Sequence, residues 1–132
     1  MLLIDRQKNL ELFCDQLRSV AAPIAFDPKR LKEIASAPPS ALSIIRVAGD
    51  SMEPNLSDGD EIMVDTSDAQ ARLRAGIYVI RLDGALAVKR LAPGGDGIAV
   101  LSDNPAFPTI PDCAPERLSL IGRVVWAGRR MR

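Results

Sequence analysis

The spacing of the apolar residues changes abruptly near Leu42, and this change restricts the folds that the chain can adopt. Before Leu42, apolar residues recur every three or four positions, as on one face of a helix. After it, they alternate or run together in short stretches separated by Gly, Pro and Asp, as in β-strands. We therefore expect a mainly β body from about Leu42 to Gly128, preceded by one or two N-terminal helices near residues 5–21 and 28–36.

The two expected helices carry start and stop signals. An apolar face recurs along the first one, at Leu10, Phe13, Cys14, Leu17 and Val20. Asp5 suits the N-terminal end of this helix, and Pro23 stops it. Asp27 and Pro28 form an N-cap followed by a proline in the first turn of the second helix. The apolar face of the first helix is open to two uses, packing on its own domain or on a partner.

The β body contains six strand-like runs, at residues 42–47, 61–64, 76–82, 85–91, 98–101 and 118–128. The dipeptide Asp83-Gly84 between two of them is typical of a two-residue hairpin turn. Gly122 indicates a bulge in the closing strand. Residues 102–115 are rich in proline, and we expect them to be ordered but irregular. Because residues 118–127 are too apolar for an open edge, we expect this strand to pair in a homodimer.

The composition fits one domain of a soluble protein. The chain has 132 residues, 47% of them hydrophobic, and its formal net charge is zero. No apolar run is long enough to cross a membrane, and the first residues become charged too early for a secretory signal. Cys14 and Cys113 are too few and too far apart for a disulfide framework or a metal site. We expect a cytoplasmic protein without cofactor or metal, divided into a helical segment, 1–40, and a β domain, 41–132.

A turn-rich loop from Val47 to Asp60 joins the first two strands of the body. It contains the motifs Gly-Asp-Ser and Ser-Asp-Gly-Asp, whose glycines suit a sharply turned backbone. A serine at the head of such a turn, Ser51, can present its hydroxyl to a cleft. The alternative is that these residues only form turns.

A lysine further along favours the chemical interpretation. The chain has no histidine, so any acyl chemistry needs another base. Strand alternation places Lys89 on the same face as Ala87 and Leu91. Burial disfavours the ammonium and lowers the pKa of a lysine, which makes it a usable general base. A surface lysine whose head reaches water is the alternative for Lys89 alone; together with Ser51, a Ser–Lys dyad is the better interpretation.

Five separated blocks then resemble one known family. They are Gly49–Pro54, Asp58–Asp60, Val88–Leu91, Ser102–Pro105 and Ile121–Trp126. In this order they closely resemble the C-terminal domain of LexA-type and phage repressors, over about residues 26–130. The resemblance implies a mostly β, LexA-like fold with Ser51 as nucleophile and Lys89 as general base. It also implies that backbone N–H groups of Asp50 and Ser51 form the oxyanion hole.

The resemblance further implies a regulator of transcription that cuts a segment of its own chain. In that family a RecA-type filament acts as co-protease in the SOS response, and the domain forms homodimers. DNA would be bound only through a helix-turn-helix domain, for which this sequence has no room. The usual Ala-Gly or Cys-Gly cleavage bond is also missing, because no glycine precedes Gly49.

Three alternatives stay open to different degrees. A free-standing protein akin to the processed accessory subunits of error-prone polymerases would share the domain but also needs an upstream cleavage bond. A signal peptidase would need a membrane anchor and a further Gly-Asp box after Lys89, and neither occurs. A binding module with a relic dyad fits the same residues without catalysis.

Overall fold

The computed structural model describes residues 2–3, 17–19, 25–26, 28–34, 38–67, 73–94 and 97–129. In chain order its elements are β1 (Leu2–Leu3), β2 (Leu17–Ser19), β3 (Ala25–Phe26), α1 (Pro28–Ile34), the 3-10 turn η2 (Pro39–Ala41), β4 (Leu42–Val47), β5 (Glu61–Asp65), β6 (Gly76–Leu82), β7 (Ala85–Pro93), β8 (Ile98–Leu101), β9 (Ile110–Cys113), the 3-10 turn η4 (Pro115–Arg117) and β10 (Leu118–Gly128). The mainly β class predicted from the sequence is confirmed. Among the described residues, no helix is long and apolar enough to cross a membrane.

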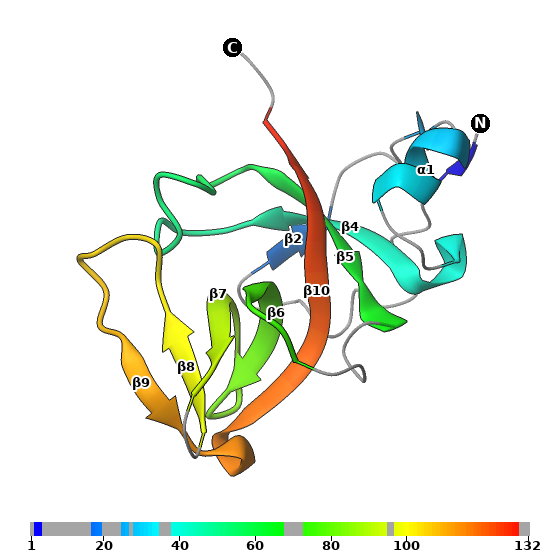
Figure 1. The fold of residues 1–132 in the computed structure, drawn as a ribbon. Helices are drawn as coiled ribbons and strands as arrows, with labels where there is room; N and C mark the ends of the chain where they lie inside the picture. Colours follow the sequence, from blue (N-terminus) through cyan, green and yellow to red (C-terminus); the bar gives the residue numbers. More distant parts are fainter. Residues whose placement is uncertain are drawn as a thin grey trace.

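Eight of the strands form one antiparallel sheet in the order β2-β4-β5-β10-β6-β7-β8-β9. The long strand β10 crosses the middle of the molecule and connects its two halves (Figure 1). Its residues 118–123 pair with β6, and its residues 123–128 pair with β5. Each half of β10 thus has one hydrogen-bonded neighbour within the chain, and the expected pairing of this strand in a homodimer stays a prediction.

Bulges allow β10 to change partners. The register shifts between Leu120 and Gly122 in the pairing with β6, and between Val124 and Trp126 in the pairing with β5. The bulge predicted at Gly122 is confirmed. A Cβ atom on Gly122 would lie 2.5 Å from Val64 Cγ1 and 2.9 Å from the carbonyl oxygen of Asp65. The absence of a side chain therefore lets β10 approach β5 closely at the point of transfer.

The hairpin between β6 and β7 fixes the position of Lys89. Asp83 and Gly84 both have positive φ values, 50° and 87°, as a two-residue primed turn requires. The register that follows from this turn places Lys89 opposite Tyr78. The hairpin predicted from Asp83-Gly84 is confirmed.

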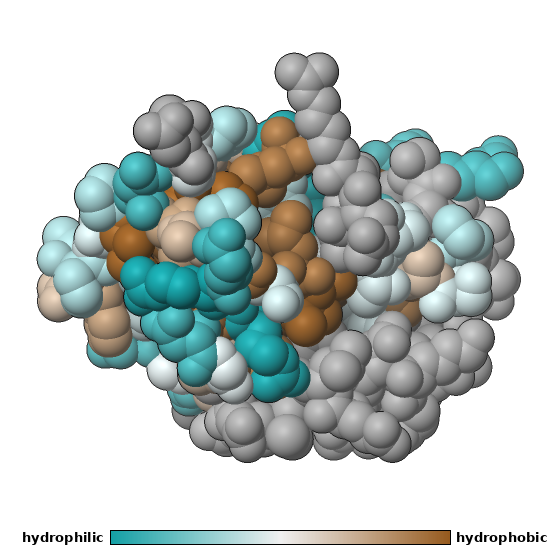
Figure 2. Space-filling model, turned by 90° about the horizontal axis from the view of Figure 1, so that it is seen from below, coloured by the Kyte–Doolittle hydropathy of each residue, from teal (hydrophilic) through white to brown (hydrophobic). Residues whose placement is uncertain are grey.

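Two clusters of the hydrophobic core lie on opposite faces of β6 and β7. The first contains Ile45, Val47, Met52, Leu56, Ile62, Val64, Val79, Leu86 and Val88, and the second contains Tyr78, Ile80, Leu91, Val100 and Cys113. Partly buried residues extend the second cluster, among them Ala87, Ile98, Ile110 and Leu120. Apolar side chains also gather in the middle of the face seen in Figure 2, with polar side chains beside them. Some apolar side chains of the domain therefore lie on its surface.

The N-terminal part differs from the sequence prediction. The second expected helix is confirmed by α1. Most of the first, 5–21, lies outside the described residues, but Leu17–Ser19 form β2 and pair with β4, so the helix prediction is wrong there. Strand β4 offers unpaired N–H and C=O groups along its outer edge, and pairing with them outweighs the local helical pattern.

The proline-rich segment 102–115 also contains an element that the sequence pattern missed. Residues Ile110–Cys113 form β9, which pairs with β8 at the end of the sheet. Pro111 lies inside this strand. A proline is tolerated there because an edge strand leaves one row of N–H groups without a partner strand.

The close approach at Gly122 leads to a stability prediction. Gly122→Ala is expected to lower the free energy of unfolding by about 1–3 kcal/mol, because the added methyl group overlaps Val64 and the backbone of Asp65. Urea unfolding followed by tryptophan fluorescence measures this difference. The control is Ser119→Ala on the exposed side of the same strand, expected to stay within about 0.5 kcal/mol. Equal midpoints for wild type and Gly122→Ala would show that β10 does not need glycine at the transfer point.

Candidate active site

The loop that carries Ser51 is closed at its base by backbone hydrogen bonds. Val47 donates to the carbonyl of Asp60, and Gly59 donates to the carbonyl of Val47, both at 2.8 Å. Gly49 and Gly59 each have φ of 91°, which favours glycine, and the N–H of Gly49 donates to Asp58 Oδ1 at 2.8 Å. The sharply turned backbone expected from the glycines is therefore present.

Two apolar side chains anchor the tip of this loop. Met52 and Leu56 are 2% and 3% exposed and belong to the first core cluster. Ser51 immediately precedes Met52 and is itself only partly buried. Because its neighbour is fixed in the core, Ser51 is held at the rim of the loop rather than inside the sheet.

An ion pair secures the far end of the loop. Arg129, directly after β10, places its Nε and Nη2 atoms 2.9 Å from the two carboxylate oxygens of Asp60, and its Nη2 also donates to Ser57 Oγ at 2.8 Å. This guanidinium lowers the pKa of Asp60, against the opposing effect of burial. The loop is thus tied to the end of the central strand.

Lys89 lies on β7 with its amine partly shielded from water. Ala87 and Leu91 belong to the second core cluster and Val88 to the first, so Lys89 faces the second cluster, as strand alternation predicts. Its Nζ donates to Ser102 Oγ at 2.7 Å and lies 5.5 Å from the centre of the Phe107 ring. Burial lowers the pKa of Lys89, in the direction expected from the sequence.

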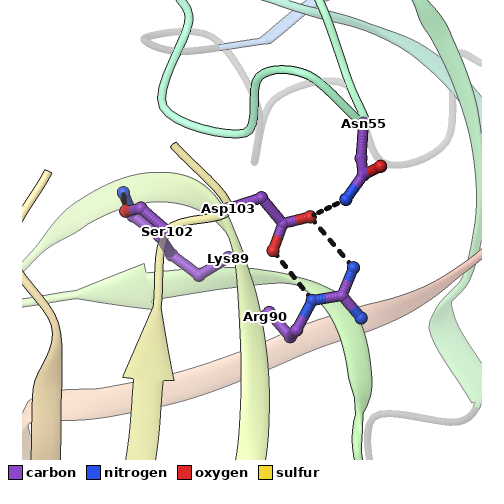
Figure 3. Close-up of polar contacts among 5 residues, drawn as sticks. All are labelled: Asn55, Lys89, Arg90, Ser102 and Asp103. Carbon is purple, nitrogen blue, oxygen red and sulfur yellow. Dashed lines mark hydrogen bonds and ion pairs between the residues drawn. The ribbon is translucent and has the colours of Figure 1, made fainter. Parts of the chain in front are cut away.

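Three consecutive residues after β8, Ser102, Asp103 and Asn104, form what we call the bridging segment. Asp103 accepts two hydrogen bonds from the guanidinium of Arg90 on β7, at 2.8 and 2.9 Å. The same carboxylate accepts a hydrogen bond from Nδ2 of Asn55 in the Ser51 loop, at 2.7 Å. Figure 3 shows Asp103 between these two partners, with Ser102 and Lys89 beside them. The bridging segment therefore contacts both the lysine strand and the serine loop.

Asn104 completes the connection at the backbone of the serine loop. Its N–H donates to the carbonyl of Ser51 and its side-chain amide donates to the carbonyl of Asp50, both at 3.0 Å. The N–H of Glu53 also donates to the Asp50 carbonyl, at 3.1 Å. In a planar trans peptide the N–H points away from the preceding C=O. Holding the Asp50 carbonyl therefore fixes the direction of the Ser51 N–H, one of the two donors expected in an oxyanion hole.

A family model described as Peptidase S24-like matches residues 16–125 of this chain. The chain belongs to that family. Together with the two relatives described next, this match confirms the predicted relationship to LexA-type and phage repressors.

Two curated proteins are similar to this chain. The 26 kDa repressor protein of Escherichia phage HK022 is 36% identical over 94 residues, which cover 67% of this chain and 38% of the repressor. The HTH-type transcriptional regulator PrtR of Pseudomonas aeruginosa PAO1 is 38% identical over 96 residues, which cover 67% of this chain and 36% of the regulator. The chain thus matches little more than a third of the length of either relative.

The S24-like domain joins the segments of both predicted catalytic residues through the bridging segment. Ser51 lies in the predicted loop and Lys89 on the predicted strand. The hydrogen bond of the Lys89 amine described above goes to Ser102, and the approach of Ser51 Oγ to Lys89 Nζ stays a prediction. Among the described residues, no group of three Cys, Asp or Glu side chains is placed to hold a metal ion.

Sequence reasoning missed the roles of Ser102 and Asn104. The block Ser102–Pro105 was recognised as part of the family resemblance, but no contact was assigned to it. The contact of Ser102 depends on the register of β7 with β8, which the sequence does not fix: Arg90 pairs with Leu101 and Leu91 with Val100. Continuing this register by one residue brings Ser102 opposite Lys89.

The Arg90–Asp103 pair leads to a prediction for stability against pH. The guanidinium of Arg90 lowers the pKa of Asp103, opposed by burial and assisted by Asn55. Since the folded pKa is below the unfolded value of about 3.9, the stabilisation is present above that pH and is lost as the pH falls through the folded value. The side chain of Asp103 is 8% exposed and that of Arg90 41%, so Asp103→Asn is expected to cost about 1–2 kcal/mol at pH 7.

Urea unfolding of wild type and Asp103→Asn at a series of pH values tests this expectation. The difference between them should shrink as the pH falls below about 4, because the wild-type carboxylate then becomes neutral. Asp112→Asn, at an exposed carboxylate on β9, is the matched control and is expected within about 0.5 kcal/mol of wild type. A difference that is the same at every pH would mean that the negative charge of Asp103 is not what stabilises the fold.

Proposed function

We propose that this S24-like domain is a serine peptidase in which Ser51 is the nucleophile and Lys89 the general base. The observation that carries the proposal is the environment of Lys89. Its amine is partly buried, its hydrogen-bond partner is an uncharged hydroxyl, and its pKa is lowered by burial. Such a lysine can be neutral at moderately alkaline pH and then has a lone pair for a proton.

The proposed reaction is acyl transfer in two steps. The Ser51 Oγ–H bond breaks as Oγ bonds to the carbonyl carbon of a peptide, and the proton passes to the lone pair of Lys89. Lys89 then gives the proton to the leaving amine as the C–N bond breaks. Water attacks the resulting ester, and its proton follows the same route back to Ser51. The N–H groups of Asp50 and Ser51 would stabilise the oxyanion, and the contacts of Asn104 support the orientation of the second.

We further propose that the domain is part of a transcription regulator and controls the activity of that regulator by self-cleavage and homodimerisation. The two relatives are named as a repressor and as an HTH-type transcriptional regulator, which supports this assignment. DNA would be bound through a separate domain, and a RecA-type filament would promote the cleavage. The cellular setting expected for such a regulator is the cytoplasm.

A second candidate function is a binding module without catalysis. One observation favours it: the amine of Lys89 donates to Ser102 rather than to Ser51. In that case Ser51 and Lys89 would be structural residues, and replacing either would leave the function unchanged. The cleavage experiment below separates the two candidates.

The peptidase proposal predicts cleavage of an added peptide. A peptide with a central Ala-Gly bond is expected to be cut by the wild type, with kcat rising as Lys89 loses its proton at a pH below the 10.4 or so of free lysine. Ser51→Ala and Lys89→Arg should each lower kcat by about a hundredfold or more, because a guanidinium keeps its proton.

Mass spectrometry of the products measures the cleavage. The variant Lys89→Met tests whether activity is lost because the base is missing rather than because the fold is disturbed. This variant should be as inactive as Lys89→Arg while its circular dichroism stays that of the wild type. Lys32→Arg, at an exposed lysine on α1, is the matched control and should retain full activity. Cleavage that survives in Ser51→Ala would come from a contaminant or another residue and would refute the proposed nucleophile.

The proposed assembly is tested by sedimentation. The support for a homodimer comes from the family and from the partly buried apolar residues that reach the surface. Sedimentation velocity at tens of micromolar protein is expected to show twice the chain mass. A monomer at this concentration would contradict the dimer and leave the peptidase proposal unaffected.

A further inference from the structure

The hydrogen bond from Lys89 to Ser102 follows from the pairing of two neighbouring strands. In the antiparallel pair β7–β8, Leu91 lies opposite Val100 and Arg90 opposite Leu101. The next pair in this register is Lys89 with Ser102, whose side chains leave the sheet on the same face. Ser102 directly follows β8, and the 2.7 Å distance from Nζ to Oγ agrees with this extension of the register.

Two further contacts of the bridging segment hold Ser102 in place. On its C-terminal side, Asp103 is bound to Arg90 on β7. One residue later, the N–H of Asn104 is bound to the carbonyl of Ser51. The hydroxyl of Ser102 is thus positioned both against the strand of the proposed base and against the loop of the proposed nucleophile.

A lysine that acts as a base needs such a partner. A neutral amine has two N–H bonds and one lone pair, and it turns freely about its Cε–Nζ bond. When a neighbouring oxygen accepts a hydrogen bond from one of these N–H groups, it restricts this rotation and limits the directions in which the lone pair can point. After the amine takes a proton, the same oxygen still accepts one N–H of the ammonium, and the face of the Phe107 ring lies 5.5 Å away.

We propose that Ser102 is the positioning residue of Lys89: its hydroxyl holds the amine so that the lone pair is directed toward the serine loop. The inference rests on the proposed peptidase function and adds a third side chain to it. Ser102 exchanges no proton in the reaction. It acts through Lys89, whose amine donates a hydrogen bond to its Oγ in the structure.

A hydroxyl suits this role better than a carboxylate. A carboxylate at the same distance would favour the ammonium strongly and remove the base. A neutral oxygen also favours the ammonium, but more weakly, so the amine can still release its proton. The ionisable groups on the adjacent segments are engaged elsewhere: Arg90 and Asp103 bind one another, and the Tyr78 hydroxyl donates to the carbonyl of Arg74.

The first test is a titration of Lys89 that does not depend on cleavage. The chain has four lysines, so a protein labelled with ¹³C at lysine Cε gives few signals, and the signal missing from Lys89→Met identifies residue 89. Because Ser102 accepts a hydrogen bond from the charged form, Ser102→Ala is expected to lower the midpoint of Lys89 by about one pH unit. Ser102→Thr keeps the hydroxyl and should titrate close to the wild type.

The second test is the cleavage of the Ala-Gly peptide by the same variants. Ser102→Ala is expected to lower kcat by about tenfold or more with little change in KM, since the substrate still binds but the base is poorly oriented. Ser102→Thr should restore most of the rate. Ser119→Ala, a serine on β10 far along the sheet, is the matched control and should behave as wild type in both tests.

The outcomes separate the inference from the function on which it rests. If the wild type cuts the peptide and Ser102→Ala cuts it equally well, or if Ser102→Ala leaves the midpoint of Lys89 unchanged, the positioning role is refuted. If the wild type cuts no peptide, the peptidase proposal fails. The titration then decides alone whether Ser102 holds the amine.

Discussion

Arg90 on β7 and Asp103 after β8 form a two-pronged ion pair, and the relation between the two sides of the candidate site depends on it. A planar guanidinium and a planar carboxylate joined by two parallel hydrogen bonds are fixed in orientation as well as in distance. Asp103 also accepts a hydrogen bond from Asn55 in the serine loop. The ion pair therefore holds both neighbours of Asp103 in place. Ser102 binds Lys89, and Asn104 binds the backbone of Ser51.

The same ion pair has an electrostatic consequence for Lys89. Asp103 lies directly after the serine that binds the lysine amine, and an unpaired carboxylate so close would keep that amine protonated. Pairing with Arg90 neutralises most of its field, while the positive charge of Arg90 disfavours a second cation nearby. The lowered pKa of Lys89 itself is caused by burial of its amine. One contact thus aligns the site and limits the effect of the Asp103 charge on the lysine, as the proposed role of Lys89 requires.

The fold was predictable where local chemistry decides it. The hairpin at Asp83-Gly84 needs two positive φ values that few other dipeptides adopt readily, and the apolar pattern after Leu42 has the period of a strand. The strands β2 and β9 were not predictable in this way. They are short, and each is a strand because the edge of a neighbouring strand, β4 or β8, offers hydrogen-bonding groups. Such pairing is invisible in the sequence of the strand itself.

The site was predictable in its residue types, but not in its register. Ser51 and Lys89 stand out because the chain lacks histidine and contains few lysines. The partner of Lys89 depends instead on the turn between β7 and β8, which joins Pro93 to Ile98 and is closed by a bond from the Gly94 N–H to the Gly97 carbonyl at 2.9 Å. A glycine-rich sequence permits several lengths for this turn.

A slip of one residue in that turn would change the chemistry of the site. With the register shifted one way, Leu101 would stand opposite Lys89, and the amine would lose its acceptor. With the register shifted the other way, Asp103 would stand there, and the carboxylate would keep the lysine protonated. Only the observed register, with Ser102 opposite Lys89, gives the amine a neutral acceptor and leaves Asp103 free to bind Arg90. A backbone turn that lies outside the site therefore decides which side chain the Lys89 amine meets.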